Sequence, residues 1–329
     1  MSCALCRGNN FKLISEKDSK SKDKLIVCFC NACSMVSQNP IPTEQQVEQY
    51  YATEYRQDYK QVFEPKLKHV YRAGNLALDR LGFLTKNNVL SGKLLDVGAG
   101  GGEFTYVSSQ LGFDSTGIEP NIGYSNYARD QYQANVKTGQ LADVDGKFDV
   151  ITMFHVMEHI PDPIKTFKKL YDLLNEDGFL FIEVPNIESF SQSPGNTFFK
   201  AHIHYFSTAT LVCAASKYFE TIDIDCDSNL RVLFKRKAEV GDLLLPTQDQ
   251  INQTIKRLKK KGWLEYIFKG SGYKKLPLRL SKIFIESRLS ENVHRVFISH
   301  DKKRRGASSD HQSEILLLNF LCYPFKNPP

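Results

Sequence analysis

The chain has 329 residues, of which 41% are hydrophobic and 24% are charged, as in ordinary globular proteins. It is long for one domain and suits a core domain with additions at both ends. The net charge of +6 is unevenly placed, because residues 238–329 hold 17 Lys and Arg against 9 Asp and Glu. Residues 1–237 carry a slight acidic excess, which argues against a nucleic acid lying across that part.

Neither end of the sequence shows an export or membrane signal. Residues 1–24 are polar and lack the apolar centre of a signal peptide. The apolar run at 315–325 is interrupted by Asn319 and is too short to span a bilayer. We therefore expect a cytoplasmic protein.

Cysteines mark the first segment, residues 1–40. Two Cys-x-x-Cys pairs lie 23 residues apart, and in a reducing compartment this pattern predicts a closed, structural zinc site. Cys28 could replace Cys30 as a ligand, and unrelated free thiols are the alternative to metal binding. The expected zinc ligands are Cys3, Cys6, Cys30 and Cys33.

A tyrosine-rich segment follows at residues 41–90. Pro40 and Pro42 end the first module, and Thr43 with Gln46 three places on predicts the start of a helix. Tyrosines at helical spacing usually pack against a core, while a lid over a bound ligand is the functional interpretation. These tyrosines are Tyr50, Tyr51, Tyr55, Tyr59 and Tyr71.

The stretch Lys93–Phe104 predicts a strand, a tight glycine turn and a helix. Its glycines would let the backbone approach a nucleotide-like ligand closely. A dinucleotide-binding loop needs a third small residue where this chain has Glu103. The acidic Asp96 at the strand end would repel a pyrophosphate but could accept hydrogen bonds from an ammonium group.

Glu119 ends the next predicted strand, 23 residues after Asp96, where a carboxylate can bind both hydroxyls of a ribose. At this point the chain resembles the class I methyltransferases. Lys147–Pro163 and Asp177–Pro185 resemble that family's fourth and fifth strands and the segment after the fourth. The resemblance implies a Rossmann-like, doubly wound α/β domain at residues 91–237, with an antiparallel last strand.

The resemblance also implies S-adenosylmethionine as the cofactor. In similar enzymes the segment after the third strand contacts the adenine, and the exit of strand four lies over the methionine part. The expected cofactor-binding residues are Asp96, Gly98, Ala99, Gly100, Gly102, Glu119, Pro120, Gln140, Leu141, Phe154 and His155.

Local patterns predict the remaining elements of this domain. Gly112 and Gly178 end helices, and Asp162 caps a helix that has Pro163 in its first turn. The predicted helices are 103–111, 121–132, one that begins at 163, and 211–219. The predicted strands are 115–118, 136–139, 149–153, 177–185 and a closing antiparallel hairpin of 221–225 with 231–237.

Histidines are the candidate general bases, because imidazole titrates near neutral pH. His202 and His204 share one side of an extended segment that follows strand five, where an acceptor must sit. In similar enzymes a Glu-His-x-x-Tyr-Phe motif places its histidine on His202, but Ala201 stands here for the glutamate. Histidines held by the backbone are the structural alternative. His159 is a third candidate, which with Glu158 could instead hold the loop.

The resemblance stops near Lys237, and residues 238–329 form a basic C-terminal extension. Its clusters, at 256–261 and 302–305, are most often solvated surfaces. Attraction to an anionic substrate, a membrane surface or a nucleic acid is the alternative.

The chain is most similar to zinc-ribbon methyltransferases of sugar and surface-glycan pathways. We therefore expect methyl transfer to a hydroxyl or carbon of a nucleotide-linked or glycan sugar. Methylation of a quinone-like metabolite or of RNA is an alternative, and a non-catalytic zinc-ribbon binding protein is another. The sequence contains no signal for oligomeric state.

Overall fold

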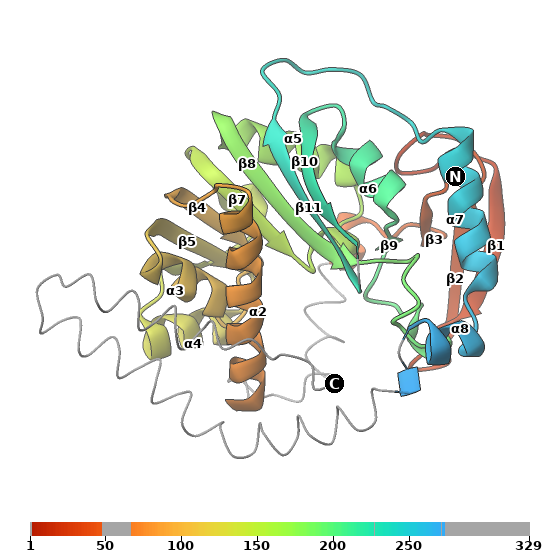
Figure 1. Ribbon diagram of the computed structural model, residues 1–329, viewed down its shortest axis with the longest axis horizontal. Helices are drawn as coiled ribbons and strands as arrows, with labels where there is room; N and C mark the ends of the chain where they lie inside the picture. The colour runs from red at the N-terminus through yellow and green to blue at the C-terminus, as the bar shows by residue number, and fades with distance from the viewer. Residues whose placement is uncertain (1, 48–66, 227, 271, 274–329) are drawn as a thin grey trace, which may run out of the picture.

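A seven-stranded mixed sheet forms the centre of the protein (Figure 1). The computed structural model describes residues 2–47, 67–226, 228–270 and 272–273. The strand order is β10-β11-β8-β7-β4-β5-β6, in which β11 is antiparallel to both neighbours and the other pairs are parallel. The strands are β4 (Gly92–Val97), β5 (Phe113–Glu119), β6 (Val136–Thr138), β7 (Phe148–Phe154), β8 (Leu174–Pro185), β10 (Phe219–Asp225) and β11 (Asn229–Arg236).

Five helices cover the two faces of this sheet. On one face, α2, α3 and α4 share an apolar core with Leu94 and Phe181, and on the other α5 and α6 pack over Leu95 and Ile182. These helices are α2 (Leu67–Lys86), α3 (Glu103–Gln110), α4 (Ile122–Tyr132), α5 (Pro163–Leu173) and α6 (Thr208–Ala215). The expected Rossmann-like α/β fold with an antiparallel last strand is confirmed.

Local signals explain where several helices begin. The Asn121 side chain accepts hydrogen bonds from two backbone N–H groups of the first turn of α4. Asp162, which directly precedes Pro163 at the start of α5, accepts one from Lys165 N. Helix α6 begins three residues earlier than predicted, because Ser207 and Thr210 form a reciprocal capping box.

The N-terminal segment forms a second sheet that includes a strand from much later in the chain. Its antiparallel order is β1-β2-β3-β9, and β3 pairs with β9 through Val36 opposite Tyr205 and Ser37 opposite His204. Buried Cys3 and Met35 belong to the same core cluster as the α5 and α6 side of the large sheet. The strands are β1 (Phe11–Lys17), β2 (Lys24–Cys30), β3 (Val36–Gln38) and β9 (His204–Tyr205).

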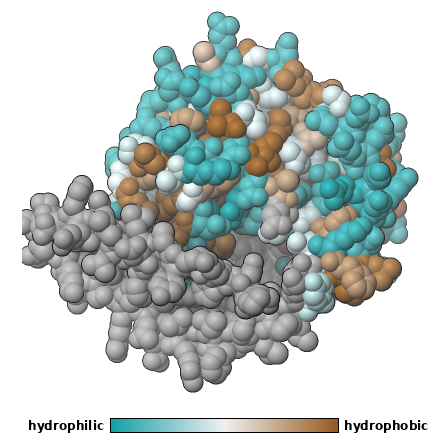
Figure 2. Space-filling view, viewed as in Figure 1, coloured by the Kyte–Doolittle hydropathy of each residue, from teal (hydrophilic) through white to brown (hydrophobic). Residues whose placement is uncertain are grey.

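Part of the C-terminal extension packs on this second sheet. Helix α7 (Gln248–Lys260) places Ile251, Ile255 and Leu258 against a cluster that contains Val27 and Phe29 of β2. The basic residues of α7 lie on its exposed side, as expected for a solvated face. The next helix, α8 (Trp263–Phe268), exposes apolar side chains, which Figure 2 shows as a brown patch at the lower right.

Several sequence expectations fall outside the described residues. They concern the tyrosine-rich stretch up to residue 59 and the basic cluster at 302–305. The expected helix start at Thr43 is described, and Thr43 and Gln46 exchange reciprocal capping hydrogen bonds. Among the described residues, no helix combines the length and apolar character needed to cross a bilayer.

Candidate active site and cysteine cluster

The glycine turn lies between β4 and α3, at the carboxyl ends of the parallel strands. The backbone N–H groups of Gly98 and Ala99 both donate to Ile118 O, and Gly102 N donates to Ala99 O. Gly98 and Gly100 adopt positive φ angles of 74° and 55°. A Cβ on Gly98 would collide with Val156, whereas one on Gly100 would enter open space. The turn therefore leaves room for a ligand at Gly100.

Glu119 ends β5 beside this turn. Its Oε2 accepts from Gly100 N at 2.9 Å and its Oε1 accepts from Asn121 N at 2.9 Å. Burial raises the pKa of Glu119, and the two backbone hydrogen bonds oppose that rise. A carboxylate offers about four acceptor positions, so two remain for a ligand diol. The following Pro120 is exposed.

Asp96 is almost fully buried, with 2% of its surface exposed. Its Oδ1 accepts from Thr152 Oγ1 at 2.9 Å, and its Oδ2 accepts from Thr105 Oγ1 at 3.0 Å. Burial raises the pKa of Asp96 against the effect of these two bonds. Asp96 thus ties β4 to β7 and α3 beneath the turn, and its contact with an ammonium group stays a prediction.

The other expected cofactor residues lie at neighbouring strand ends. Gln140 caps the short 3₁₀ helix η1 (Leu141–Asp143) that follows β6, and Leu141 packs partly against the core. Phe154 ends β7, makes edge contacts with two phenyl rings and carries the Arg80 guanidinium 4.0 Å above its ring. His155 follows with a left-handed φ of 57°. The structure thus gathers these residues around the carboxyl edge of the sheet.

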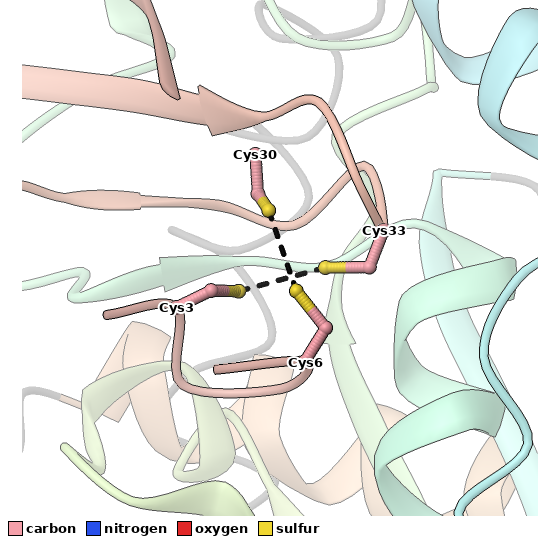
Figure 3. Close-up of side chains that lie close together, drawn as sticks. All are labelled: Cys3, Cys6, Cys30 and Cys33. Atoms are coloured by element: carbon pink, nitrogen blue, oxygen red, sulfur yellow. Dashed lines mark hydrogen bonds between the residues drawn. The ribbon is translucent and has the colours of Figure 1, made fainter. Parts of the chain in front are cut away.

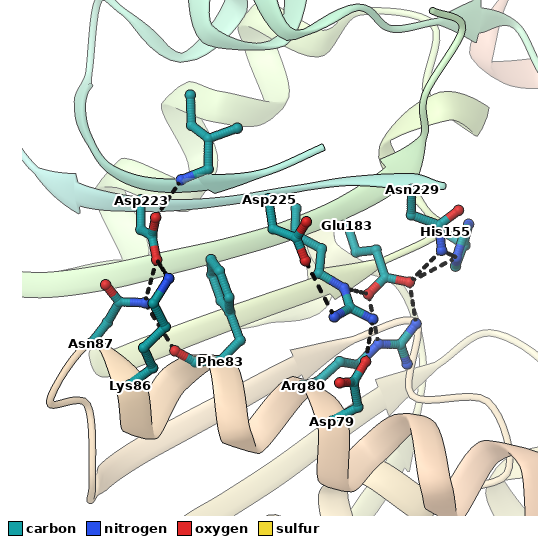
Figure 4. A network of polar contacts seen from close by, with 12 residues as sticks. Asp79, Arg80, Phe83, Lys86, Asn87, His155, Glu183, Asp223, Asp225 and Asn229 are labelled. Atoms are coloured by element: carbon teal, nitrogen blue, oxygen red, sulfur yellow. Dashed lines mark hydrogen bonds and ion pairs between the residues drawn. The ribbon is translucent and has the colours of Figure 1, made fainter. Parts of the chain in front are cut away.

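A buried charge network surrounds Glu183 of β8, and the sequence analysis missed it (Figure 4). Its carboxylate accepts two hydrogen bonds from Arg80 at 3.1 Å and one from Arg231 Nε at 2.8 Å. Asn229 and His155 also contact Oε1, at 2.9 and 3.1 Å. Burial opposes ionisation of Glu183, but these donors outweigh it and hold its pKa below the ordinary range. The sequence signal was an acid within the otherwise apolar run at 179–184.

His155 links this network to a second buried carboxylate. Its Nδ1 lies 3.3 Å from Glu158 Oε1, and its Nε2 contacts Glu183. Burial opposes charging of the ring, but the two carboxylates outweigh it and raise the pKa of His155 to about 9. His155 is therefore a cation at neutral pH.

Two of the candidate bases meet at Glu158, in the 3₁₀ helix η2 (Met157–His159). The Nε2 atoms of His159 and His202 lie 3.9 and 4.0 Å from Glu158 Oε1. Their rings form an edge contact with centroids 4.9 Å apart. Burial, with help from the His159 charge, lowers the pKa of His202 to about 3. Burial therefore keeps the His202 ring neutral and lowers its basicity.

His204 lies in a different environment. It is fully buried in β9, and its Nδ1 and Nε2 lie 2.8 Å from Ser37 Oγ and 3.1 Å from Pro161 O. Burial lowers the pKa of His204 to about 4. Because both ring nitrogens have protein partners, this geometry favours a structural role, and the choice between His202 and His204 as base stays a prediction.

The four expected zinc ligands lie together at one end of the second sheet (Figure 3). Their sulfur atoms lie within 4.8 Å of one another, with Cys3 to Cys33 and Cys6 to Cys30 at 3.5 Å. Cys28 is outside this cluster and accepts a hydrogen bond from Asn39 Nδ2. A tetrahedral zinc site with Zn–S bonds of about 2.3 Å places its sulfurs about 3.8 Å apart. The cluster therefore has dimensions that fit such an ion.

Comparison with known proteins bears on the larger domain. Residues 68–218 match a family described as a methyltransferase domain. These residues are therefore similar to a methyltransferase domain, in agreement with the fold. S-Adenosylmethionine is the cofactor of such domains, and the open space at Gly100 with the spare acceptor positions of Glu119 fits it.

Relatives of this methyltransferase domain include ubiquinone biosynthesis O-methyltransferases. The protein from Glaesserella parasuis is 34% identical over 123 residues, which are 32% of this chain and 52% of the relative. That from Colwellia psychrerythraea is 28% identical over 121 residues, 34% of this chain and 49% of the relative. The chain thus spans about half the length of the curated relatives it matches.

Solved structures of methyltransferases are also similar. Magnesium protoporphyrin IX methyltransferase from Synechocystis with bound SAH has a TM-score of 0.46 and 15% identity, covering 59% of this chain and 100% of that one. A Thermotoga maritima SAM-dependent methyltransferase, described as a possible histamine N-methyltransferase, has a TM-score of 0.41 and 18% identity. This match covers 58% of this chain and 99% of the Thermotoga chain.

Proposed function

We propose that this protein transfers a methyl group from S-adenosylmethionine to a hydroxyl group of a small-molecule acceptor. The observation that carries the proposal is the pairing of the glycine turn with Glu119, through Gly100 N, at the carboxyl ends of β4 and β5. A ligand diol on Glu119 and an open path over Gly100 suit an adenosine followed by an amino-acid chain.

When bound, the cofactor supplies an electrophilic methyl group on a sulfonium sulfur. The chain's residues align the acceptor with that methyl group and remove the acceptor's proton. We assign the proton acceptor to His202, because it lies on the loop that follows β8 and its Nε2 faces the Glu158 carboxylate, which can stabilise the charged ring. His155 is not assigned this role, because both of its ring nitrogens already carry a proton and face carboxylates.

Two lines of support favour different classes of methyl acceptor. Relatives named ubiquinone biosynthesis O-methyltransferases favour a phenolic, quinone-like hydroxyl. The resemblance that the sequence analysis drew to zinc-ribbon methyltransferases would favour a sugar or glycan instead. The slight acidic excess of residues 1–237 favours either small molecule over a nucleic acid. We place the phenolic acceptor first, because curated relatives carry that name.

Calorimetry of S-adenosylmethionine binding tests the cofactor assignment. A lost charge-assisted pair costs about 2 to 3 kcal/mol, so Glu119→Ala should weaken binding roughly thirtyfold or more. Asp114→Ala, at the opposite end of β5 and exposed, is the control and should bind normally. Unchanged affinity in a folded Glu119→Ala protein would refute the assignment. Labelled-methyl transfer to catechols and to nucleotide-linked sugars then separates the acceptor classes.

We further propose that Cys3, Cys6, Cys30 and Cys33 hold one structural zinc ion. The support is that the four sulfur atoms lie within 4.8 Å of one another, and four thiolates would complete a closed shell with no open position for substrate. Metal analysis should find about one zinc per chain, and less in Cys33→Ser. The exposed Cys226→Ser variant is the control and should keep its zinc. Protein that was never exposed to chelator and contains no zinc would refute this proposal.

A further inference from the structure

Glu158 is a buried acid whose surroundings are unusual. Its side chain is 1% exposed, and three imidazoles, those of His155, His159 and His202, lie 3.3 to 4.0 Å from its Oε1. Its Oε2 has no hydrogen-bond partner among the described residues. Burying a carboxylate is costly unless it is paired, so these rings account for its presence there.

Hydrogen bonds hold η2 and the His202 loop against each other at this point. Ile203 N donates to Glu158 O at 2.8 Å, and His159 Nδ1 lies 2.6 Å from Ala201 O. A carbonyl only accepts, so His159 carries its proton on Nδ1 in that bond. The His202 ring is fixed from the other side by Phe199, whose ring centroid is 3.9 Å away. Glu158 and His202 are therefore held in a defined orientation.

We propose that Glu158 is the positioning residue for His202. Its carboxylate favours the tautomer that carries hydrogen on Nε2, which leaves the Nδ1 lone pair for the acceptor hydroxyl. When His202 takes that proton, the acceptor oxygen becomes the nucleophile and the new imidazolium faces the Glu158 charge. A carboxylate that orients a histidine base serves the same two purposes in hydrolytic triads.

Glu158 supplies a carboxylate that the sequence next to His202 lacks. Ala201 stands where similar enzymes have a glutamate directly before the histidine, so no carboxylate precedes His202 in the chain. Glu158, 44 residues earlier in the sequence, supplies one at 4.0 Å in space. The separation from Nε2 exceeds a hydrogen bond, and the contact shortens when the ring becomes charged.

The test is a double-mutant cycle in the full-length protein, and it rests on the proposed methyl transfer with His202 as base. Glu158→Gln should lower kcat about a hundredfold or more while the Kd for S-adenosylmethionine stays within twofold. In the His202→Ala background the same change should cost almost nothing further. Glu188→Gln, which alters a carboxylate that accepts a hydrogen bond from Thr254, is the matched control and should keep kcat.

Nitrogen-15 NMR of the histidine rings supplies a readout that does not depend on activity. Wild-type His202 should show hydrogen on Nε2, and Glu158→Gln should show a mixture of tautomers. Glu158→Asp should restore part of kcat and of the tautomer preference. The inference is overturned if the Glu158 and His202 effects are additive, or if Glu158→Gln leaves the His202 tautomer unchanged. Failure of wild-type protein to bind the cofactor would instead overturn the proposed function.

Discussion

Removing the charge of Glu183 should strongly destabilise the protein. Glu183 is fully buried and accepts from five donor atoms, on Arg80, Arg231, Asn229 and His155. Glu183→Gln keeps the shape but removes the charge and turns one acceptor into a donor that faces other donors. Breaking a buried ion pair from one side costs about 3 to 5 kcal/mol, because the partner charges stay buried.

Urea denaturation followed by circular dichroism would measure this loss. Asp172→Asn is the control, because its ion pair with Lys168 is exposed on one helix and solvent screens it, so its loss should change stability little. A Glu183→Gln protein within about 1 kcal/mol of wild type would refute the reasoning. It would mean that water or a shifted side chain compensates Arg80 and Arg231, and that the network does not fix α2 against β8.

Three further predictions concern the histidines and the second sheet. His202→Ala should lower turnover about a hundredfold with cofactor affinity intact. His204→Ala should mainly lower the free energy of unfolding, and the reverse pattern would assign the base to His204. The pKa of His155 is raised from 6.5 to about 9, so its stabilisation is complete below pH 6.5 and is lost as pH rises through 9. Denaturation series at several pH values should show that loss, and a His155→Gln protein with the same decline as wild type would contradict it. Gln38→Ala removes two hydrogen bonds to the His202 loop, so it should lower kcat more than it lowers cofactor affinity. Steady-state kinetics would measure kcat and calorimetry the affinity, and equal losses in both would refute a local effect.

Much of the fold could be predicted because its signals are local. The glycine turn, the apolar strands and the caps at Asn121 and Asp162 each depend on residues a few positions apart. The same is true of each Cys-x-x-Cys pair, whose spacing makes a tight turn with both sulfurs on one side. The structure brings these local units together where the sequence analysis placed them.

The features that escaped prediction are those that depend on distant parts of the chain. Arg80 and Glu183 are 103 residues apart, and nothing in either local sequence indicates the other. Strand β9 has only two residues, too few for a period-two pattern, and its place is decided by its pairing with β3. Glu158 was recognised as part of a motif, but its proximity to His202 required the fold.

The pairing of β3 with β9 joins the cysteine-rich segment to the loop that carries His202. Gln38 donates from its side chain to Lys200 O and His202 O, and its backbone N donates to Ile203 O. Asp18 accepts from Lys200 N, so residues before and after β2 hold the same loop. A zinc ion held by the four cysteines would add to the core packing that orders this segment, and would thereby also stabilise the His202 loop. The second sheet therefore supports the loop that carries His202, the proposed base.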